Sequence, residues 1–514
     1  MAAPSLAAPI FGRAVPRGAV RDRSITARLA PLLVVALTAL GLILRLRGLV
    51  VPWRDIWIDE AFSIWLAELP PWHAVQVIAQ VDQHPPLYAL LLHLWLLPRD
   101  DPWWARFSSV LAGTTTIPVA GLLGRAVRGW RLCLVAAALV AFSPILVRYS
   151  QEVRMYALVS LFVFLSTLLL VQALAGNRRG AWVAFGVVTL LLVYTHNITL
   201  FLLPAQALFV CWKARSDTAR LRAYLVTMAV VGLLWLPWVP VLGHQARGVV
   251  QRFWISPPTW PTVAPVLLDY VNAFTPKAGA VAGHQFPLAL WGNRLLWPFV
   301  ALALLGLVAG LRRFGLLFLL TFALPILITL GLSHVRPIFE ERVLLYVTTG
   351  AIMLLASGIA AVRMLPINLL LLAPILWLNI LSLNNYNLNS KKEQWQSAAN
   401  YVAQHAQPGD LILFNATWAQ LPFDYYYRRQ PAPALVKHGL PVDLFDRGVL
   451  EPPFQQSDIT TAVRLSAGHQ HVWLLLSHNW YNDPEDLIPP VMGTLFSHAQ
   501  KQQFSGIQLV YYSK

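Results

Sequence analysis

Residues 29–63 of the chain read LAPLLVVALTALGLILRLRGLVVPWRDIWIDEAFS and join two features that rarely adjoin in a soluble protein. The apolar run at 29–50 has about the length that a helix needs to cross a bilayer. Three carboxylates, Asp55, Asp59 and Glu60, follow it. Because charge is costly at membrane depth, acids at the end of a spanning helix usually have a solvated face or a functional role. The stretch therefore predicts a membrane helix that delivers acidic side chains to one membrane surface.

The composition extends this interpretation to the whole chain. Of its 514 residues, 57% are hydrophobic and only 12% are charged, whereas roughly 25% are charged in a typical soluble domain. Apolar runs of near-spanning length recur up to about Ser382. The net charge of +16 does not indicate nucleic-acid binding, because the basic residues lie mostly in short loops between apolar runs. The sequence predicts a polytopic α-helical membrane protein.

The charged loops predict the orientation. Residues 1–28 form a basic tail, and no small-residue cleavage site follows the first apolar run, so we expect an uncleaved signal anchor. With eleven crossings, seventeen Lys and Arg and two acids fall on the side of this tail, and the other eleven acids before residue 385 fall opposite. The positive-inside rule then places the N-terminus in the cytoplasm and the C-terminus outside the cell inner (plasma) membrane. The expected helices lie at about 29–50, 104–124, 132–147, 155–175, 181–195, 198–212, 223–243, 295–311, 314–332, 343–361 and 365–382.

Two segments between these helices differ from the rest. Leu87–Leu97 is apolar but short for a crossing, so we expect an interfacial or re-entrant helix. The outer loop at about 244–294 is rich in Pro and Trp, and aromatic residues of this kind favour the headgroup level. This loop is expected to lie on the membrane, where it could cover a site.

The composition changes after Ser382. Residues 385–514 hold ten of the chain's 23 acids and contain no run long enough to cross a membrane. They predict a small extracytoplasmic α/β domain that follows a transmembrane domain at 29–384, of which 51–103 is the first outer loop. The elements expected in the α/β domain are a helix at Lys392–His405, a turn at Pro408–Asp410, strands at Leu411–Phe414, Val472–Leu476 and Ile507–Tyr512, and a helix near 484–503.

The pair Asp59 and Glu60 is the strongest local signal of chemistry. A general base must reach a solvent-delivered substrate from a protected pocket. Adjacent side chains cannot point the same way on a helix or strand. One acid could therefore serve as base while its neighbour holds an arginine or a backbone amide. The alternative is a solvated loop acid, because Asp is also a good residue to cap a helix N-terminus.

Other polar residues share the predicted outer side with these acids. His84, before two prolines, could bind phosphate, donate to a leaving group or ligate a metal, but no second ligand lies at metal spacing. Arg154 could hold a phosphate bidentately, or it could form a local ion pair with Glu152. Arg342, beside two acids, offers a second phosphate clamp, and its alternative is again a surface ion pair. The pattern requires no cofactor and leaves a divalent metal open.

Four motifs together carry a resemblance to a known family. They look like the dolichyl-phosphate-mannose/protein mannosyltransferase-like family, and more specifically its bacterial branch, the glycosyltransferase family 39 proteins that include the aminoarabinose transferase of lipid A. The resemblance spans about residues 29–382 and rests on the order and spacing of the motifs. They are Ile58–Ser63 (IDEAFS), His84–Tyr88 (HPPLY), Arg106–Gly113 (RFSSVLAG) and Ser143–Tyr156 (SPILVRYSQEVRMY).

The resemblance implies a GT-C membrane fold and a polyprenyl-phosphate sugar as donor. It implies that Asp59 is the base, that Glu152 assists at the acceptor or donor site, and that Arg342 lies near the donor phosphate. Lys391–Trp395 (KKEQW) looks like the start of the C-terminal domain of bacterial members. The aminoarabinose enzymes carry a lysine or another residue where this chain has His84, so neither their lipid A specificity nor a zinc site is carried over.

The sequence thus predicts a glycosyltransferase that moves a sugar, with inversion, from a polyprenyl-phosphate carrier to a glycan, lipid or protein acceptor on the outer face. The absence of a Gly-rich nucleotide loop agrees with a lipid-linked donor. A transporter or flippase of lipid-linked or anionic solutes is the alternative, although it would favour acids at mid-membrane. A third alternative is a scaffold that presents the C-terminal domain. The predicted site comprises Asp59, Glu60 and Glu152 for catalysis, Arg154, Arg342 and His84 for the donor phosphate, and Tyr88, Tyr156 and His196 for substrate.

Overall fold

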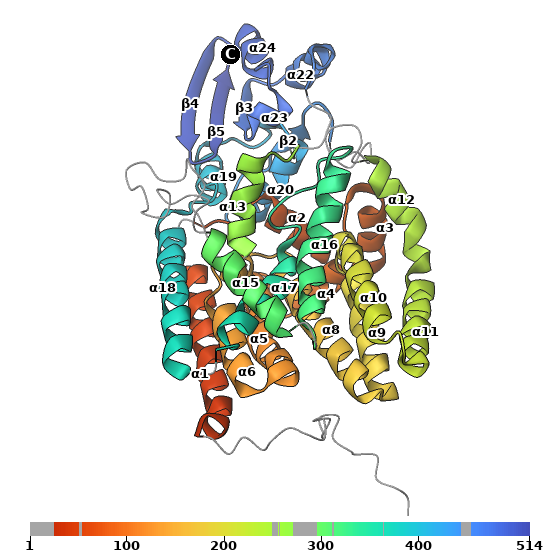
Figure 1. The fold of residues 1–514 in the computed structure, drawn as a ribbon. Helices are drawn as coiled ribbons and strands as arrows, with labels where there is room; N and C mark the ends of the chain where they lie inside the picture. The colour runs from red at the N-terminus through yellow and green to blue at the C-terminus, as the bar shows by residue number, and fades with distance from the viewer. Residues whose placement is uncertain are drawn as a thin grey trace, which may run out of the picture.

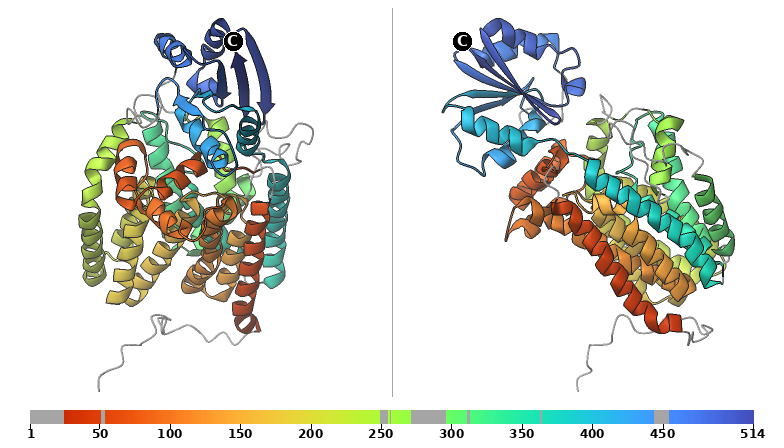
Figure 2. Two further views of the ribbon diagram at one scale, coloured as in Figure 1. Left: turned by 180° about the vertical axis from the view of Figure 1, so that it is seen from behind. Right: turned by 90° about the vertical axis from the view of Figure 1, so that its left-hand side faces the viewer.

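The protein consists of a bundle of helices that carries an α/β unit on one end (Figure 1). The computed structural model describes residues 25–50, 54–248, 255, 257–270, 296–310, 313–362, 364–443 and 454–514. Most of the predicted basic tail and much of the outer loop at 244–294 lie outside these residues. The α/β unit stands at the end of the bundle opposite to the start of α1, as both views in Figure 2 also show.

A helix is found at each of the eleven positions predicted to cross the membrane. Six helical stretches in the described part are long and apolar enough to do so, and the number of crossings stays a prediction. The helices are α1 (Ile25–Arg47), α5 (Pro102–Arg128), α6 (Trp130–Phe142), α8 (Tyr156–Gly176), α9 (Arg179–Val193), α10 (Leu202–Lys213), α11 (Thr218–Trp235) with α12 (Val239–Gly248), α15 (Leu296–Gly310), α16 (Gly315–Ser333), α17 (Thr348–Ile359) and α18 (Leu365–Asn389).

Shorter helices occupy the end of the bundle that faces the α/β unit. They are α2 (Ile58–Glu68), α3 (Pro71–Val81) and α4 (Leu87–Leu96), which lie close to one another beneath the sheet (Figure 1). The turns that join α5 to α6, α8 to α9 and α10 to α11 lie at the far end, and each carries one of the basic clusters. The charge asymmetry read from the sequence is therefore an asymmetry between the two ends of the folded bundle.

Glycines bring α15 and α17 into contact. A Cβ atom at Gly358 of α17 would lie 2.1 Å from the carbonyl oxygen of Leu302, and one at Gly306 of α15 would lie 2.0 Å from that of Leu354. Small residues at such an interface let two membrane helices pack closely without a hydrophobic driving force between them. The close approach of the two helices therefore requires glycine at positions 306 and 358.

Gly358→Ala is expected to destabilise the protein, whereas Gly232→Ala on α11 should leave stability unchanged or raise it. Gly232 is the matched control, because nothing lies within 4 Å of its added Cβ. In an open helix alanine is favoured over glycine by about 1 kcal/mol, but overpacking against a rigid backbone costs about 1–3 kcal/mol. The melting temperature in detergent should therefore fall for Gly358→Ala and stay level or rise for Gly232→Ala. Equal shifts would show that α15 and α17 do not pack in this way.

The α/β unit contains a five-stranded sheet with helices on both faces. Its strand order is β2-β1-β3-β5-β4, with β2, β1 and β3 parallel, β5 antiparallel to β3, and β4 antiparallel to β5. Trp395, Phe414 and Trp473 belong to the core on one face, and Leu413 and Leu474 to the core on the other. The elements are α19 (Trp395–His405), β1 (Leu411–Phe414), α20 (Gln420–Tyr427), β2 (Val436–Gly439), α22 (Ile459–Ser466), β3 (His471–Leu476), α23 (Asn479–Asn482), α24 (Ile488–Leu495), β4 (His498–Phe504) and β5 (Ile507–Ser513).

The predicted strands at 411–414, 472–476 and 507–512 and the turn at 408–410 are present. The predicted helix near 484–503 is wrong in its second half, because α24 ends at Leu495 and β4 follows. The polar run Ala499–Gln503 lacks a strand-like pattern, but it forms the exposed edge strand of a hairpin with β5. Pairing at a sheet edge has overridden local preference here. The short strand β2 was not predicted.

Candidate active site

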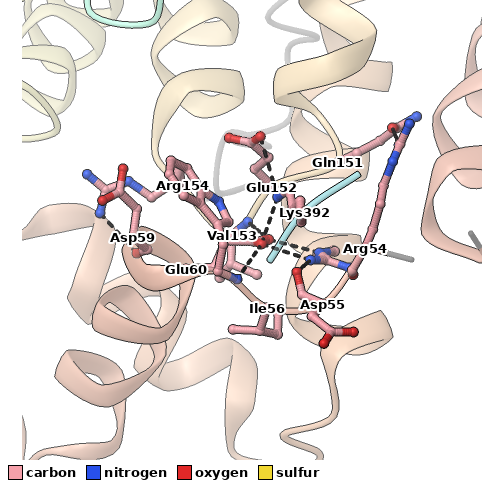
Figure 3. A network of polar contacts seen from close by, with 12 residues as sticks. Arg54, Asp55, Ile56, Asp59, Glu60, Gln151, Glu152, Val153, Arg154 and Lys392 are labelled. Atoms are coloured by element: carbon pink, nitrogen blue, oxygen red, sulfur yellow. Dashed lines mark hydrogen bonds and ion pairs between the residues drawn. The ribbon is translucent and has the colours of Figure 1, made fainter. Parts of the chain in front are cut away.

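Polar side chains from four separate parts of the chain meet where the bundle adjoins the α/β unit. The first turn of α2 supplies the two adjacent acids, and the turn between α7 (Pro144–Tyr149) and α8 supplies Glu152 and Arg154. The segment before α17 supplies Arg342, and the segment between α18 and α19 supplies Lys392. Figure 3 shows Glu60 at the centre of this polar network.

Glu60 is completely buried and fully bonded. Arg106 of α5 donates to both of its carboxylate oxygens at 2.8 Å, the backbone N–H of Val153 donates at 2.9 Å, and Lys392 lies at 2.9 Å. Burial alone would favour the neutral acid, but Arg106 and Lys392 outweigh it and lower the pKa of Glu60 to about 2. Glu60 therefore joins an arginine to a backbone amide. Its burial and its contacts are those of a carboxylate with a structural role.

Asp59 points to the other side of α2 and remains accessible. Its side chain is 27% exposed, and one carboxylate oxygen lies 2.5 Å from a guanidinium nitrogen of Arg342. Burial would raise the pKa of Asp59, but Arg342 and Arg154 together lower it below its usual value. The alternative that Asp59 caps the helix is wrong, because Trp57 occupies the N-cap position. Of the two adjacent acids, only Asp59 has a side chain that is partly exposed.

Glu152 keeps part of its hydrogen-bonding capacity unused. One carboxylate oxygen lies 3.5 Å from Lys392. The other is buried and has no hydrogen-bond partner among the described residues. A buried acceptor without a partner is costly, so such atoms frequently mark places where a ligand or water binds. The local ion pair of Glu152 with Arg154 that the sequence left open is not formed.

Arg154 instead faces Asp59 and an aromatic ring. It donates to the hydroxyl oxygen of Ser63 at 3.1 Å and to the carbonyl oxygen of Asp59 at 3.3 Å. Its guanidinium carbon lies 5.8 Å from the ring centre of Tyr156. The charges of Arg154 and Arg342 thus flank Asp59, and a cation pair of this kind is suited to a phosphate.

The two predicted histidines lie against each other beside this group. The rings of His84 and His196 are 4.7 Å apart and edge-to-face. His84 is 2.8 Å from Asp82 through Nδ1, while His196 Nδ1 accepts from the backbone N–H of Ile198 at 3.3 Å. The Nε2 atom of His196 is buried and has no partner in the described part of the chain. Tyr88 lies in the first turn of α4, where burial raises the pKa of its hydroxyl and the charge of Arg154 opposes that effect.

A second acid orders the segment that carries Arg342. Glu341 accepts from Arg148 at 3.3 Å and from the hydroxyl of Tyr149 at 3.4 Å, and its carbonyl oxygen accepts from the hydroxyl of Tyr270 at 2.7 Å. Tyr270 ends α13 (Trp260–Tyr270), which belongs to the described part of the predicted outer loop. The loop therefore contacts the turn next to the phosphate-binding candidate.

The structure brings all nine predicted site residues to one region, and it adds two cations that sequence reasoning did not assign to the site. Arg106 belongs to the motif Arg106–Gly113 and Lys392 to the motif Lys391–Trp395. No local sequence pattern indicated that both contact Glu60. Trp57 was also missed, and its ring lies 5.5 Å from Arg342 and 5.3 Å from Lys392. No group of three or more His, Cys, Asp or Glu among the described residues could hold a metal ion.

Comparison with known proteins agrees with this architecture. Residues 83–240 match the family model described as dolichyl-phosphate-mannose-protein mannosyltransferase. The chain is similar to ArnT from Cupriavidus metallidurans in the apo state, with a TM-score of 0.62 and 13% identity over 94% of this chain and 98% of that one. No curated protein matches the sequence.

Two lipid-bound structures are similar as well. One is ArnT from the same organism bound to undecaprenyl phosphate, with a TM-score of 0.58 and 12% identity over 93% of this chain and 97% of that one. The other is the archaeal oligosaccharyltransferase AglB from Archaeoglobus fulgidus in complex with an inhibitory peptide and a dolichol-phosphate, with a TM-score of 0.56 and 12% identity over 95% and 75% of the two chains. The family model and the shared fold confirm the resemblance predicted from the sequence: the chain is a membrane glycosyltransferase with the GT-C fold, similar to the dolichyl-phosphate-mannose-protein mannosyltransferases.

Proposed function

We propose that this protein transfers a sugar from a polyprenyl-phosphate carrier to an acceptor hydroxyl at the extracytoplasmic face of the cell inner membrane. Two structural neighbours, ArnT and AglB, were solved with undecaprenyl phosphate and dolichol-phosphate, which supports a donor of this class. The charge asymmetry between the two ends of the bundle supports the orientation, because the end that carries the basic turns lies away from the site.

The observation that carries this proposal is the ion pair between Asp59 and Arg342, two residues far apart in the sequence. A donor phosphate needs cations, and Arg342, Arg154 and, when protonated, His84 supply them around one position. When the phosphate binds Arg342, it competes with Asp59 for the same guanidinium. Asp59 then loses the interaction that most lowers its pKa, and it becomes a stronger base once the donor is bound.

The transfer follows from these positions. The acceptor hydroxyl attacks the anomeric carbon from the side opposite to the phosphate, so that a new oxygen–carbon bond forms as the carbon–phosphate-oxygen bond breaks. Asp59 takes the hydroxyl proton, and the polyprenyl phosphate leaves with the bonding electrons, held by the arginines. A single displacement inverts the configuration at the anomeric carbon.

Glu60 and Glu152 support this step differently. Glu60 fixes α2 to α5 and to the Val153 backbone, which positions Asp59. Glu152 has one oxygen near Lys392, and its other, unpaired oxygen can accept a hydrogen bond from a hydroxyl of the sugar or of the acceptor. Tyr88, Tyr156 and His196 are proposed to contact the substrate, because they line the same region.

Turnover of a donor mixture tests the proposal. Purified protein in proteoliposomes should release sugar from one member of a panel of radiolabelled polyprenyl-phosphate sugars, and empty liposomes should not. Movement of the intact lipid-linked sugar between leaflets without cleavage would instead identify a flippase. Absence of release from every donor in the panel, with the protein shown to be folded by its cooperative melting, would contradict the proposed donor class.

A further inference from the structure

The α/β unit carries a cavity at the end of its sheet that faces the bundle. The cavity has a volume of about 350 Å³. β4 runs towards the bundle (Figure 1). Because β5 is antiparallel to both β4 and β3, the parallel strands β1 and β3 run the same way as β4, and their carboxyl ends face the bundle. Ligands of open α/β sheets bind beyond the carboxyl ends of the parallel strands. Its lining includes Glu393, Ser477, His478, Asn479, Trp480 and Gln508.

Consecutive residues join this cavity to the catalytic group. Lys392 reaches Glu60 and Glu152, whereas the next residue, Glu393, lines the cavity. Neighbouring side chains of an extended segment point to opposite sides, so one short segment serves both sites. The backbone N–H of Gln396 donates to Asp55 at 2.8 Å, which ties this segment to the residues just before α2.

Electrostatics agree with that proximity. Burial raises the pKa of Glu393 to about 7, and the negative charge of Asp59 acts in the same direction. Burial lowers the pKa of His478, and the charge of Asp59 opposes that effect. Both residues of the cavity thus lie within reach of the Asp59 charge.

The chemistry of the lining matches a sugar. Trp480 is 66% exposed although it lies outside the membrane part, and its ring offers a flat apolar surface. The Nδ1 atom of His478 lies 3.3 Å from Glu393 and 2.9 Å from the hydroxyl oxygen of Ser477. If Nδ1 donates to the carboxylate, Nε2 is left as an acceptor, and the amides of Asn479 and Gln508 add groups that both donate and accept. A sugar ring has an apolar C–H face and a rim of hydroxyls that need both kinds of partner.

We propose that this cavity is the acceptor subsite of the transferase and that the acceptor is a carbohydrate, whose attacking hydroxyl projects from the cavity towards Asp59. The inference rests on the proposed function, which leaves the acceptor class open. A volume of about 350 Å³ lies at the lower end of the range for small-ligand pockets and suits a short saccharide. A peptide acceptor would be expected to use an open sheet edge or an extended groove, and this cavity lies at strand ends instead.

Binding of oligosaccharides to the full chain tests the inference without any donor. Detergent-solubilised protein is applied to an array of short oligosaccharides of neutral hexoses, N-acetylhexosamines and uronic acids, and to an array of peptides. The tightest saccharide is then titrated by ligand-observed NMR. Trp480→Ala should weaken its affinity by about tenfold, which corresponds to the loss of one aromatic contact. Glu393→Gln should also weaken it, and Trp72→Ala, which replaces a similarly exposed tryptophan on α3, should not.

Peptide binding without saccharide binding would overturn the acceptor class, as would binding to neither array. Saccharide affinity unchanged in both Trp480→Ala and Glu393→Gln would overturn the location. Because Trp480 is exposed, its replacement should leave the melting temperature unchanged, and a loss of affinity then reports on the cavity. The donor panel is a separate experiment, so a failure of the proposed transferase activity and a failure of this subsite are distinguishable.

Discussion

Asp59→Asn should lower the rate of sugar transfer by about a hundredfold or more, because it removes the group that takes the acceptor proton. Asn has nearly the same shape, so the substrate can still bind. The measurement is the initial rate of sugar release in proteoliposomes, with the donor that wild-type protein uses. The change in rate should appear mainly in kcat, since the lost interaction belongs to the transition state.

Glu68→Gln provides the matched control. Glu68 ends the same helix, its side chain is 26% exposed against 27% for Asp59, and it also pairs with an arginine, Arg428. Partly exposed ion pairs of this kind contribute about 0–1 kcal/mol, so both variants should melt near the wild-type temperature. Only Asp59→Asn should lose activity. A fully active Asp59→Asn protein would exclude it as the base and direct attention to Glu152.

Glu60→Gln should instead unfold the protein at a markedly lower temperature. The variant leaves Arg106 and Lys392 without the carboxylate that they share in a fully buried position. Breaking a buried ion pair by removing one partner costs about 3–5 kcal/mol. The loss should be measured as a fall in melting temperature in detergent, with Asp59→Asn as the comparison. Equal melting temperatures for the two variants would contradict the structural role of Glu60.

The same variant tests how the stabilisation by Glu60 depends on pH. The pKa of Glu60 is about 2 in the fold, below its ordinary value of 4.5, so its stabilising effect is fully present above pH 4.5 and disappears as pH falls towards 2. The difference in melting temperature between wild type and Glu60→Gln should therefore be largest near neutral pH and shrink below pH 4.5. Other acids titrate in both proteins and cancel. A difference that grew on acidification would refute the low pKa.

The division of roles between adjacent acids marks the limit of what the sequence could predict. Adjacency alone required that Asp59 and Glu60 point to different sides of a helix. It could not say which one faces inwards, because that depends on Arg106 and Lys392. Their contacts with Glu60 join residues on α2, on α5 and beyond α18, and no local pattern encodes them. The motifs predicted where the site lies, and the long-range ion pairs determine which acid is buried and which is accessible.

The fold shows the same division between local and distant information. Long apolar runs carry their own signal, and a helix was found at every predicted membrane position. The buried strands at 411–414 and 472–476 were equally clear, because an interior strand is apolar along its length. The exposed edge strand β4 was not, since its hydrogen bonds come from β5 and its side chains face solvent. The apolar pattern of a sequence indicates which residues are buried, and the residues of β4 are exposed or only partly buried.

The late position of Lys392 in the sequence determines when the polar network can be completed during synthesis. Glu60 and Arg106 are translated close together, so this pair can form while the early helices insert. Lys392 is synthesised only after the last bundle helix, α18, has been completed. A polypeptide cut short before this lysine would hold the four motifs between Ile58 and Tyr156 and still leave Glu152 without the cation of Lys392. The α/β unit can therefore not be exchanged between relatives as an independent module unless the segment at 391–396 travels with it.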